Sequence, residues 1–169
     1  LEPGAGSGNY IGTAPENMSM VGVELDPLTA SIARHLYPQA DVRTESFAHT
    51  LIRPGEYDAA IGNVPFGDIK LTDPTWNPDR RFSMHNHFMR KAAGGLHEGG
   101  VMVMLTSSYS MDTQNPAFRA EMSKDTDFLG AVRLPSGSHR RTAGTDVVTD
   151  VLVFRKRLQG EEPTAETRQ

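Results

Sequence analysis

Four consecutive residues, Asn63-Val64-Pro65-Phe66, carry the groups of this sequence that are best suited to chemistry. They follow the apolar run 59–62, which predicts that they lie at the carboxyl end of a β-strand, where open α/β sheets bind ligands. The Asn63 amide and the Val64 carbonyl offer acceptors for an NH2 group, and Phe66 offers an aromatic face. Pro65 biases Val64 toward extended conformations and so defines the direction of its carbonyl. The tetrapeptide therefore suits a planar, amino-bearing base.

A second segment with chemical character is the glycine-rich stretch Glu2-Pro3-Gly4-Ala5-Gly6-Ser7-Gly8. Glycines at alternate positions let a backbone approach a ligand closely before it turns into a helix N-terminus. The stretch lacks the Gly-Lys-Ser/Thr ending of a P-loop, which argues against triphosphate binding. Taken alone, it is equally compatible with a tight turn that has only a structural role.

The acidic residue Glu24 ends the predicted strand Met20 to Glu24. A carboxylate at the tip of a second strand can accept both hydroxyl hydrogens of a ribose. The competing interpretation is that an acid here only caps the following helix. We favour capping for Asp26, because Pro27 follows it as a first helical residue, and we favour the ribose for Glu24.

Three motifs in this order resemble those of the class I S-adenosylmethionine-dependent methyltransferases: the glycine-rich stretch, Gly22-Val23-Glu24-Leu25-Asp26-Pro27 and Gly62-Asn63-Val64-Pro65-Phe66. More narrowly, they resemble the N6-adenine DNA methyltransferases, in a branch found beside or fused to large helicases. The resemblance covers nearly the whole chain. Within the class, the aromatic-ended tetrapeptide distinguishes amino-methylating enzymes from most other members.

The resemblance implies S-adenosylmethionine as the cofactor and gives each matching residue a role. The glycine-rich stretch would surround the methionine part of the cofactor, and Glu24 would hold its ribose. The implied cofactor-binding residues are Glu2, Gly4, Ala5, Gly6, Gly8, Glu24, Leu25, Phe47 and Asn63, and the implied catalytic residues are Asn63, Val64, Pro65 and Phe66.

Two positions depart from the family pattern. Where the family often places an acid followed by an aromatic residue against the cofactor's adenine, this chain has Ser46-Phe47, with Glu45 one residue early. Phe47 is equally compatible with a place in the hydrophobic core. Val64 stands where the family usually has proline, so we expect its carbonyl to be present but held in a looser frame.

Alternating elements are predicted to position these motifs. The apolar residues Leu28, Ile32 and Leu36 are spaced as one buried stripe of a helix that ends before Pro38. Strands are predicted over 41–44, 58–62 and 101–105, with a long loop over 66–80. A second helical stripe, closed by Gly99-Gly100, and a short helix after Pro116 follow. The residues assigned to their buried faces are Phe82, Phe88, Met89, Ala92, Leu96, Phe118 and Met122.

The late segments 128–134 and 147–154 are predicted to form an antiparallel strand pair. The predicted fold is therefore a Rossmann-like, doubly wound α/β domain whose sheet is mostly parallel. We assign residues 1–158 to one methyltransferase domain and 159–169 to a polar, flexible tail. Because almost no strand precedes the glycine-rich stretch, we expect the chain to be a piece of a longer polypeptide, which the intact mass of the natural product would test.

The composition of the 169 residues is that of a soluble protein with one core, without an apolar run long enough to span a bilayer. The absence of cysteine excludes disulfides and thiolate metal sites and fits a cytoplasmic protein. A net charge of −4 argues against tight nucleic-acid binding by this chain alone. Arg140 and Arg141 are candidates for DNA phosphate contacts, whereas the run 155–157 is predicted to be a solvated surface.

His85 and His87 flank Asn86, but residues two apart on a helix point in different directions, so we predict no metal site. The favoured function is methyl transfer to the N6 amine of a flipped-out adenine in DNA. The expected partners are the DNA, bound with help from other domains, and a fused or associated helicase. Two alternatives remain open. One is methylation of a protein glutamine or an RNA base; the other is a weakly active cofactor-binding module that regulates an attached helicase or nuclease.

Overall fold

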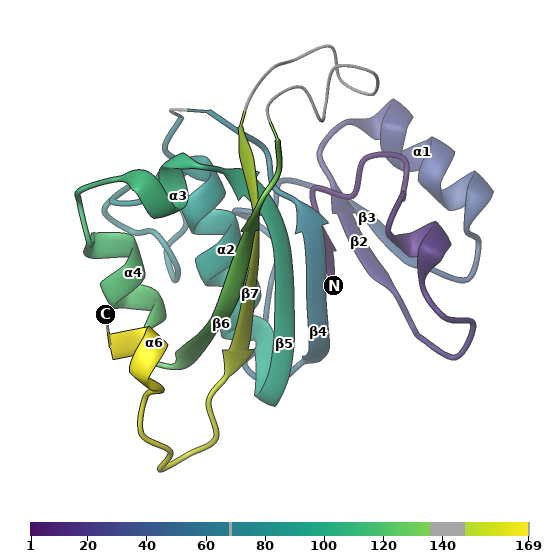
Figure 1. The fold of residues 1–169 in the computed structure, drawn as a ribbon. Coiled ribbons are helices and arrows are strands. Elements are labelled where there is room, and N and C mark those ends of the chain that lie inside the picture. The colour runs from purple at the N-terminus through teal and green to yellow at the C-terminus, as the bar shows by residue number, and fades with distance from the viewer. Residues whose placement is uncertain (68, 136–147, 169) are drawn as a thin grey trace.

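The computed structural model describes residues 1–67, 69–135 and 148–168, and strands and helices alternate along much of the chain (Figure 1). The strands are β1 (Glu2–Pro3), β2 (Val21–Glu24), β3 (Asp41–Thr44), β4 (Tyr57–Asn63), β5 (Leu96–Ser107), β6 (Thr126–Arg133) and β7 (Thr149–Lys156). The helices are η1 (Ile11–Thr13), α1 (Pro27–Leu36), α2 (Met84–Gly95), α3 (Tyr109–Asp112), α4 (Ala117–Met122) and α6 (Ala165–Arg168). Strands were therefore predicted close to where they form.

The strands form a three-stranded sheet in the order β1-β2-β3 and a four-stranded sheet in the order β4-β5-β7-β6. Leu1 joins the two sheets, because its nitrogen donates to the Ala59 carbonyl (2.9 Å) and its carbonyl accepts from the Ile61 N–H (2.9 Å). This is the bonding pattern of parallel strands. The combined order is β3-β2-β1-β4-β5-β7-β6, with β7 antiparallel to both of its neighbours. The predicted mostly parallel sheet with a late antiparallel pair is confirmed.

The strand order reverses between β1 and β4, so the ligand-binding crevice of an open α/β sheet is expected at this point. The glycine-rich stretch leaves the carboxyl end of β1, and the tetrapeptide leaves the carboxyl end of β4. The two motifs with the strongest chemical character therefore meet where the fold binds ligands.

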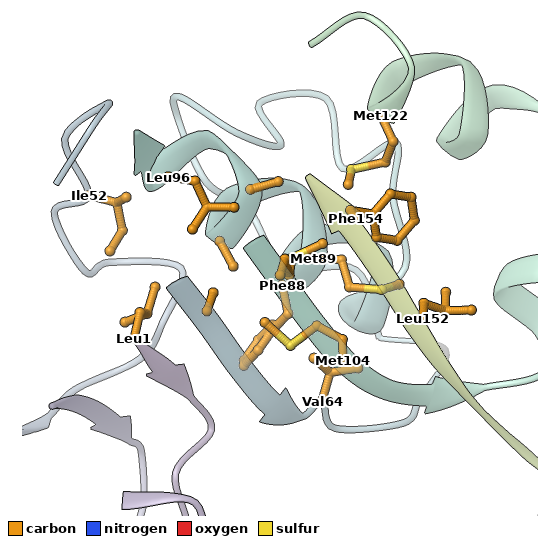
Figure 2. Packing of buried hydrophobic residues seen from close by; sticks show 14 of the residues in the cluster. Leu1, Ile52, Val64, Phe88, Met89, Leu96, Met104, Met122, Leu152 and Phe154 are labelled. Carbon is orange, nitrogen blue, oxygen red and sulfur yellow. The ribbon is translucent and has the colours of Figure 1, made fainter. Parts of the chain in front are cut away.

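The main hydrophobic core lies between α2 and the strands β4, β5 and β7 (Figure 2). Met89, Met102, Met104 and Leu152 are completely buried there. A smaller cluster lies under α1 and includes Ala30 and Ala33. Both cores lie against the sheet, so they hold the strands from which the two motifs extend.

The predicted buried stripe of the first helix is wrong. Leu28, Ile32 and Leu36 are exposed by 71, 44 and 54%, and the buried face consists of Ala30 and Ala33. Small side chains allow α1 to pack closely on the sheet, and the larger apolar residues lie on another face of the helix. The i, i+4, i+8 spacing was therefore real, but it marked a solvent-facing stripe.

The predicted end of the second helix is also wrong. The helix α2 ends at Gly95 and Leu96 already belongs to β5, so the Gly99-Gly100 pair lies within the strand. Two glycines lie within α2 because neighbouring side chains leave no space for a Cβ. A Cβ at Gly94 would lie 2.0 Å from the Trp76 ring, and a Cβ at Gly95 would lie 2.5 Å from Ile52. These glycines therefore allow close packing, as well as ending the helix.

The basic run 155–157 is not the solvated surface that was predicted. The Asp127 carboxylate is buried and binds both Arg155 (3.0 Å) and Arg157 (3.0 Å), and the Arg157 side chain is only 8% exposed. The tail predicted to be flexible includes α6, where the Thr167 hydroxyl accepts from the Phe128 N–H at 2.8 Å. The end of the described chain is therefore fastened to β6. Among the described residues, no helix has the length and apolar character needed to cross a membrane.

The corrected orientation of α1 predicts a contrast in stability. Leu28→Gln, Ile32→Gln and Leu36→Gln should each change the free energy of unfolding by no more than about 0.5 kcal/mol, because the side chains are exposed. Ala33→Leu should lower it by about 1–3 kcal/mol, because a larger side chain has no space against the sheet. Urea unfolding measures both, and a large loss in the three glutamine variants would contradict the burial pattern.

Candidate functional site

A cavity of about 310 Å³ lies at the carboxyl ends of β2, β3 and β4, where the motifs converge. Small-ligand pockets typically have volumes of about 300–1,000 Å³. Of the residues named from the sequence, the cavity brings together Gly4, Glu24, Leu25, Phe47, Asn63 and Pro65. Its other lining residues are Val23, Glu45, Ser46, Leu71, Met84 and Phe88. Glu2, Ala5, Gly6, Gly8, Val64 and Phe66 do not line it.

Sequence reasoning missed the apolar wall formed by Leu71, Met84 and Phe88. Phe88 had been assigned only to the core, and it serves both, because its ring packs at 4.8 Å from the ring of Phe47. Phe47 is likewise 3% exposed and lines the cavity. Phe47 is therefore a core residue that also lines the cavity, and its contact with the adenine of the cofactor stays a prediction.

The glycine-rich stretch needs glycine for its backbone conformation. Gly4, Gly6 and Gly8 have φ angles of +68, +56 and +86°, a region that other residues rarely adopt. Gly4 lines the cavity, and a Cβ there would lie 3.5 Å from the Phe88 ring and 3.6 Å from Pro65. Ala5, by contrast, is buried beneath the turn, where its N–H donates to the Val23 carbonyl at 2.9 Å. The turn therefore places the backbone of Gly4 at the cavity without a side chain in between.

Glu2 lies underneath this turn. Its side chain is only 2% exposed, and its Oε2 accepts from the Ile11 N–H at 3.0 Å. Burial raises the pKa of the Glu2 carboxyl to about 7, although hydrogen bonds from Ile11 and Tyr10 oppose the rise. In the described structure, Glu2 therefore supports the glycine-rich turn through a buried hydrogen bond and does not face the cavity.

The Glu24 carboxylate ties the turn to the second strand. Its Oε2 accepts from the Gly6 N–H and its Oε1 from the Asp26 N–H, both at 2.8 Å. Each carboxylate oxygen can accept a further hydrogen bond, and Glu24 lines the cavity. Asp26 instead accepts from the Thr29 N–H at 2.8 Å and caps α1, as predicted.

The tetrapeptide begins at the last residue of β4. Asn63 lines the cavity, and the Val64 N–H donates to the Leu105 carbonyl at 3.0 Å, which extends the pairing of β4 with β5. The Val64 side chain is 1% exposed and lies in the main core (Figure 2). The expectation of a looser frame at Val64 is therefore wrong, because a hydrogen bond that proline could not donate holds this residue in place.

The aromatic end of the tetrapeptide has a different environment. Pro65 lines the cavity, whereas the Phe66 side chain is 41% exposed. A large apolar side chain at this degree of exposure leaves a face that a further ligand can cover. The tetrapeptide thus combines a fixed backbone with an exposed ring.

The two histidines around Asn86 do not converge on one point. His85 lies beside the Ser83 hydroxyl, and the Nε2 of the buried His87 lies 2.9 Å from the Asp73 carboxylate. Within the described ranges, no group of three or more His, Asp or Glu side chains is arranged to hold a metal ion. Arg140 and Arg141 lie outside the described residues, so their predicted phosphate contacts stay a prediction.

No family model matches the chain. Its sequence is 32% identical over 163 residues to the defense against restriction protein B of Escherichia phage P1. The match covers 92% of this chain and 7% of the phage protein, so the chain spans less than a tenth of that relative.

Solved structures share the fold. A Listeria monocytogenes protein assigned as a class I S-adenosylmethionine-dependent methyltransferase has a TM-score of 0.79 and 20% identity, covering 98% of this chain and 55% of its own. The M protein of the type I restriction enzyme EcoKI has a TM-score of 0.73 and 18% identity, with coverages of 98 and 41%. A modification subunit assigned to a type I restriction enzyme of Vibrio vulnificus reaches 0.69 and 17%, with coverages of 92 and 40%. The chain therefore has the class I methyltransferase fold.

The buried Glu2 predicts a pH dependence of stability. Because its folded pKa of about 7 exceeds the ordinary value of 4.5, its contribution is complete below pH 4.5 and is lost as the pH rises to about 7. The upper limit of this loss is about 3 kcal/mol. Glu2→Gln keeps an oxygen acceptor for Ile11 but cannot ionise.

The difference in free energy of unfolding, variant minus wild type, should therefore grow in favour of Glu2→Gln between pH 4.5 and 7.5. Urea unfolding at several pH values measures it, and comparing the two proteins cancels the other titrating groups. A difference that stays constant over this range would contradict the buried state of Glu2.

Proposed function

We propose that this chain, which has the class I methyltransferase fold, transfers a methyl group from S-adenosylmethionine to the N6 amine of adenine in DNA. The observation that carries the proposal is the position of the tetrapeptide at the switch point of the sheet, where Asn63 and Pro65 line the cavity and Val64 lies between them. The fold of the solved methyltransferases supports the cofactor, and the relative and the two restriction-enzyme subunits support a restriction-modification setting.

The cavity fits the cofactor by its chemistry. Glu24 offers carboxylate oxygens for a ribose, and Phe47, Leu71 and Phe88 offer apolar surface for an adenine ring. Glu45 lines the cavity in place of the acid that the family often has at Ser46, so we assign the adenine amino group to the Glu45 carboxylate. Gly4 leaves space for the part of the ligand that meets the turn.

Asn63, Val64 and Phe66 would act on the target base. The lone pair of an exocyclic amine is delocalised into the ring, so acceptors that hold its two hydrogens favour a more pyramidal, more nucleophilic nitrogen. The Asn63 side chain and the Val64 carbonyl supply these acceptors. The hydrogen bond from the Val64 N–H to Leu105 fixes the peptide unit before this carbonyl, and Pro65 restricts Val64 to extended conformations, so the carbonyl should need little rearrangement when the base arrives.

When bound against Gly4, Glu24 and Phe47, S-adenosylmethionine would supply an activated methyl group on a sulfonium, whose sulfur would keep the electron pair when the methyl passes to the amine nitrogen. No base is needed beforehand, because the methylated amine releases its proton to water afterwards. Phe66 would stack on the extruded base and offset an unstacking cost of a few kcal/mol.

A labelled methyl group distinguishes the alternative substrates, because it ends up in a different chemical unit for each. Incubation with methyl-labelled S-adenosylmethionine and DNA, RNA or protein, followed by digestion and mass spectrometry, identifies the methylated unit. Labelled N6-methyladenine from DNA supports the proposal. Label in glutamine or RNA would move the same chemistry to another amino group, and cofactor binding without turnover on any of the three would favour a regulatory module.

Asn63→Ala should reduce methyl transfer by about 10²–10³-fold, the range for removing one preorganised group at a reacting centre. The matched control is Asn17→Ala, because Asn17 is an exposed asparagine before the amino end of β2, whereas the cavity lies at the carboxyl ends of the strands. The control should leave the rate of label transfer unchanged. Equal activity of Asn63→Ala and the wild type would remove Asn63 from the mechanism.

Phe66→Ala should raise the KM for DNA about tenfold, since stacking of a base on an aromatic side chain contributes about 1–3 kcal/mol. The affinity for the cofactor product S-adenosylhomocysteine should stay the same, because Phe66 does not line the cavity. Phe66→Tyr keeps the aromatic face and should behave as the wild type in steady-state kinetics. An unchanged KM in Phe66→Ala would contradict the stacking role.

A further inference from the structure

Three ionisable side chains that the proposed mechanism does not use form a cluster beside the cavity. Asp73 lies in the loop between β4 and α2, and His87 and Lys91 lie one turn apart on α2. The Asp73 Oδ2 accepts from His87 Nε2 at 2.9 Å and from Lys91 Nζ at 2.8 Å. The three residues are 2, 0 and 2% exposed. We call these residues the α2 cluster.

The α2 cluster is electrically balanced. Burial opposes the charge on Asp73, but the hydrogen bonds from Lys91 and His87 hold its pKa below the ordinary value. Burial lowers the pKa of Lys91, which the bond to Asp73 partly offsets, and burial lowers the pKa of His87. Among the described residues, nothing bonds to the buried His87 Nδ1, as suits a neutral ring. The cluster is therefore an Asp73–Lys91 ion pair with a neutral histidine.

The α2 cluster connects two loops that line the cavity. Lys91 Nζ also donates to the Ala48 carbonyl at 3.3 Å and lies 5.2 Å from the centre of the Phe47 ring. The His87 ring lies 6.3 Å from the same ring. Lys91 therefore fastens the loop of Phe47 to helix α2.

The second loop is fastened through Asp73, which follows the cavity residue Leu71 by two positions. Its Oδ1 accepts from the N–H groups of Thr75 and Trp76, both at 3.0 Å, so this carboxylate also organises the turn in which it lies. Asn77 Nδ2 also donates to the Leu71 carbonyl at 2.8 Å, within the same loop. Removing the ion pair would therefore loosen the attachment of both loops to α2, most directly that of the Phe47 loop.

We infer that Asp73, His87 and Lys91 are positioning residues that fix Phe47 and Leu71 against the adenine of the methyl donor without touching it. The inference rests on the proposed function, since it assigns the ligand of the same cavity. A ring and a loop held in place before binding lose little conformational freedom when the ligand arrives, so affinity depends on the cluster. If the α2 cluster only stabilised the fold, the affinity for the ligand would fall and recover together with the free energy of unfolding.

Two variants separate these roles. Lys91→Met removes the cation from a side chain of similar length and leaves a buried carboxylate, so the protein should unfold at lower urea concentration. Asp73→Asn/Lys91→Met removes both charges and should recover most of that loss. Neither variant restores the tie between Lys91, Ala48 and Phe47. The affinity for S-adenosylhomocysteine, measured by calorimetry, should therefore fall about tenfold in both, equivalent to about 1.4 kcal/mol.

The matched control is Arg157→Met, which also breaks a buried ion pair, with Asp127 of β6, at the far edge of the sheet from the cavity. It should leave the affinity unchanged. Recovery of both stability and affinity in the double variant would overturn the inference, while wild-type binding would still support the proposed function. A wild-type chain that binds no S-adenosylhomocysteine would overturn both. If Lys91→Met does not fold, the double variant alone decides.

Discussion

The pairing of β1 with β4 is the interaction on which the rest of this structure depends. Two hydrogen bonds of Leu1 join the three-stranded sheet to the four-stranded sheet. We call this junction the seam, and the strand order reverses there. The seam must be narrow, since a Cβ at Gly62 would lie 3.3 Å from the Pro3 carbonyl. The glycine turn and the tetrapeptide face one another only because these two short strands lie side by side.

The walls around the seam are held by two different kinds of interaction. The tetrapeptide is held by the sheet itself, through the Val64–Leu105 hydrogen bond and the burial of the Val64 side chain. The loops that contain Phe47 and Leu71 lie outside the strands. Buried hydrogen bonds from Lys91 of α2, to the Ala48 carbonyl and to the Asp73 carboxylate, attach these loops to the helix. A buried polar network of this kind defines one arrangement, because any other leaves a charge without a partner.

Much of the fold and part of the site could be predicted from the sequence, because the signals were local. Strand positions, the Asp26 cap and the glycine turn depend on neighbours within a few residues. The burial of Arg157 depends on Asp127, 30 residues away, and that of Lys91 on Asp73, 18 residues away. The exposed stripe of α1 misled for the same reason, since periodicity shows that a helix has faces and tertiary packing decides which face is buried.

The hydrogen bond from Val64 has a consequence for how such sites are recognised. At the second position of the tetrapeptide, a proline ring and a bonded valine are two chemically different ways to restrain one carbonyl. In this chain strand pairing fixes the backbone at this position, and the buried Val64 side chain packs in the core. A search pattern that insists on proline there would pass over chains like this one, whereas a pattern written in terms of strand pairing would retain them.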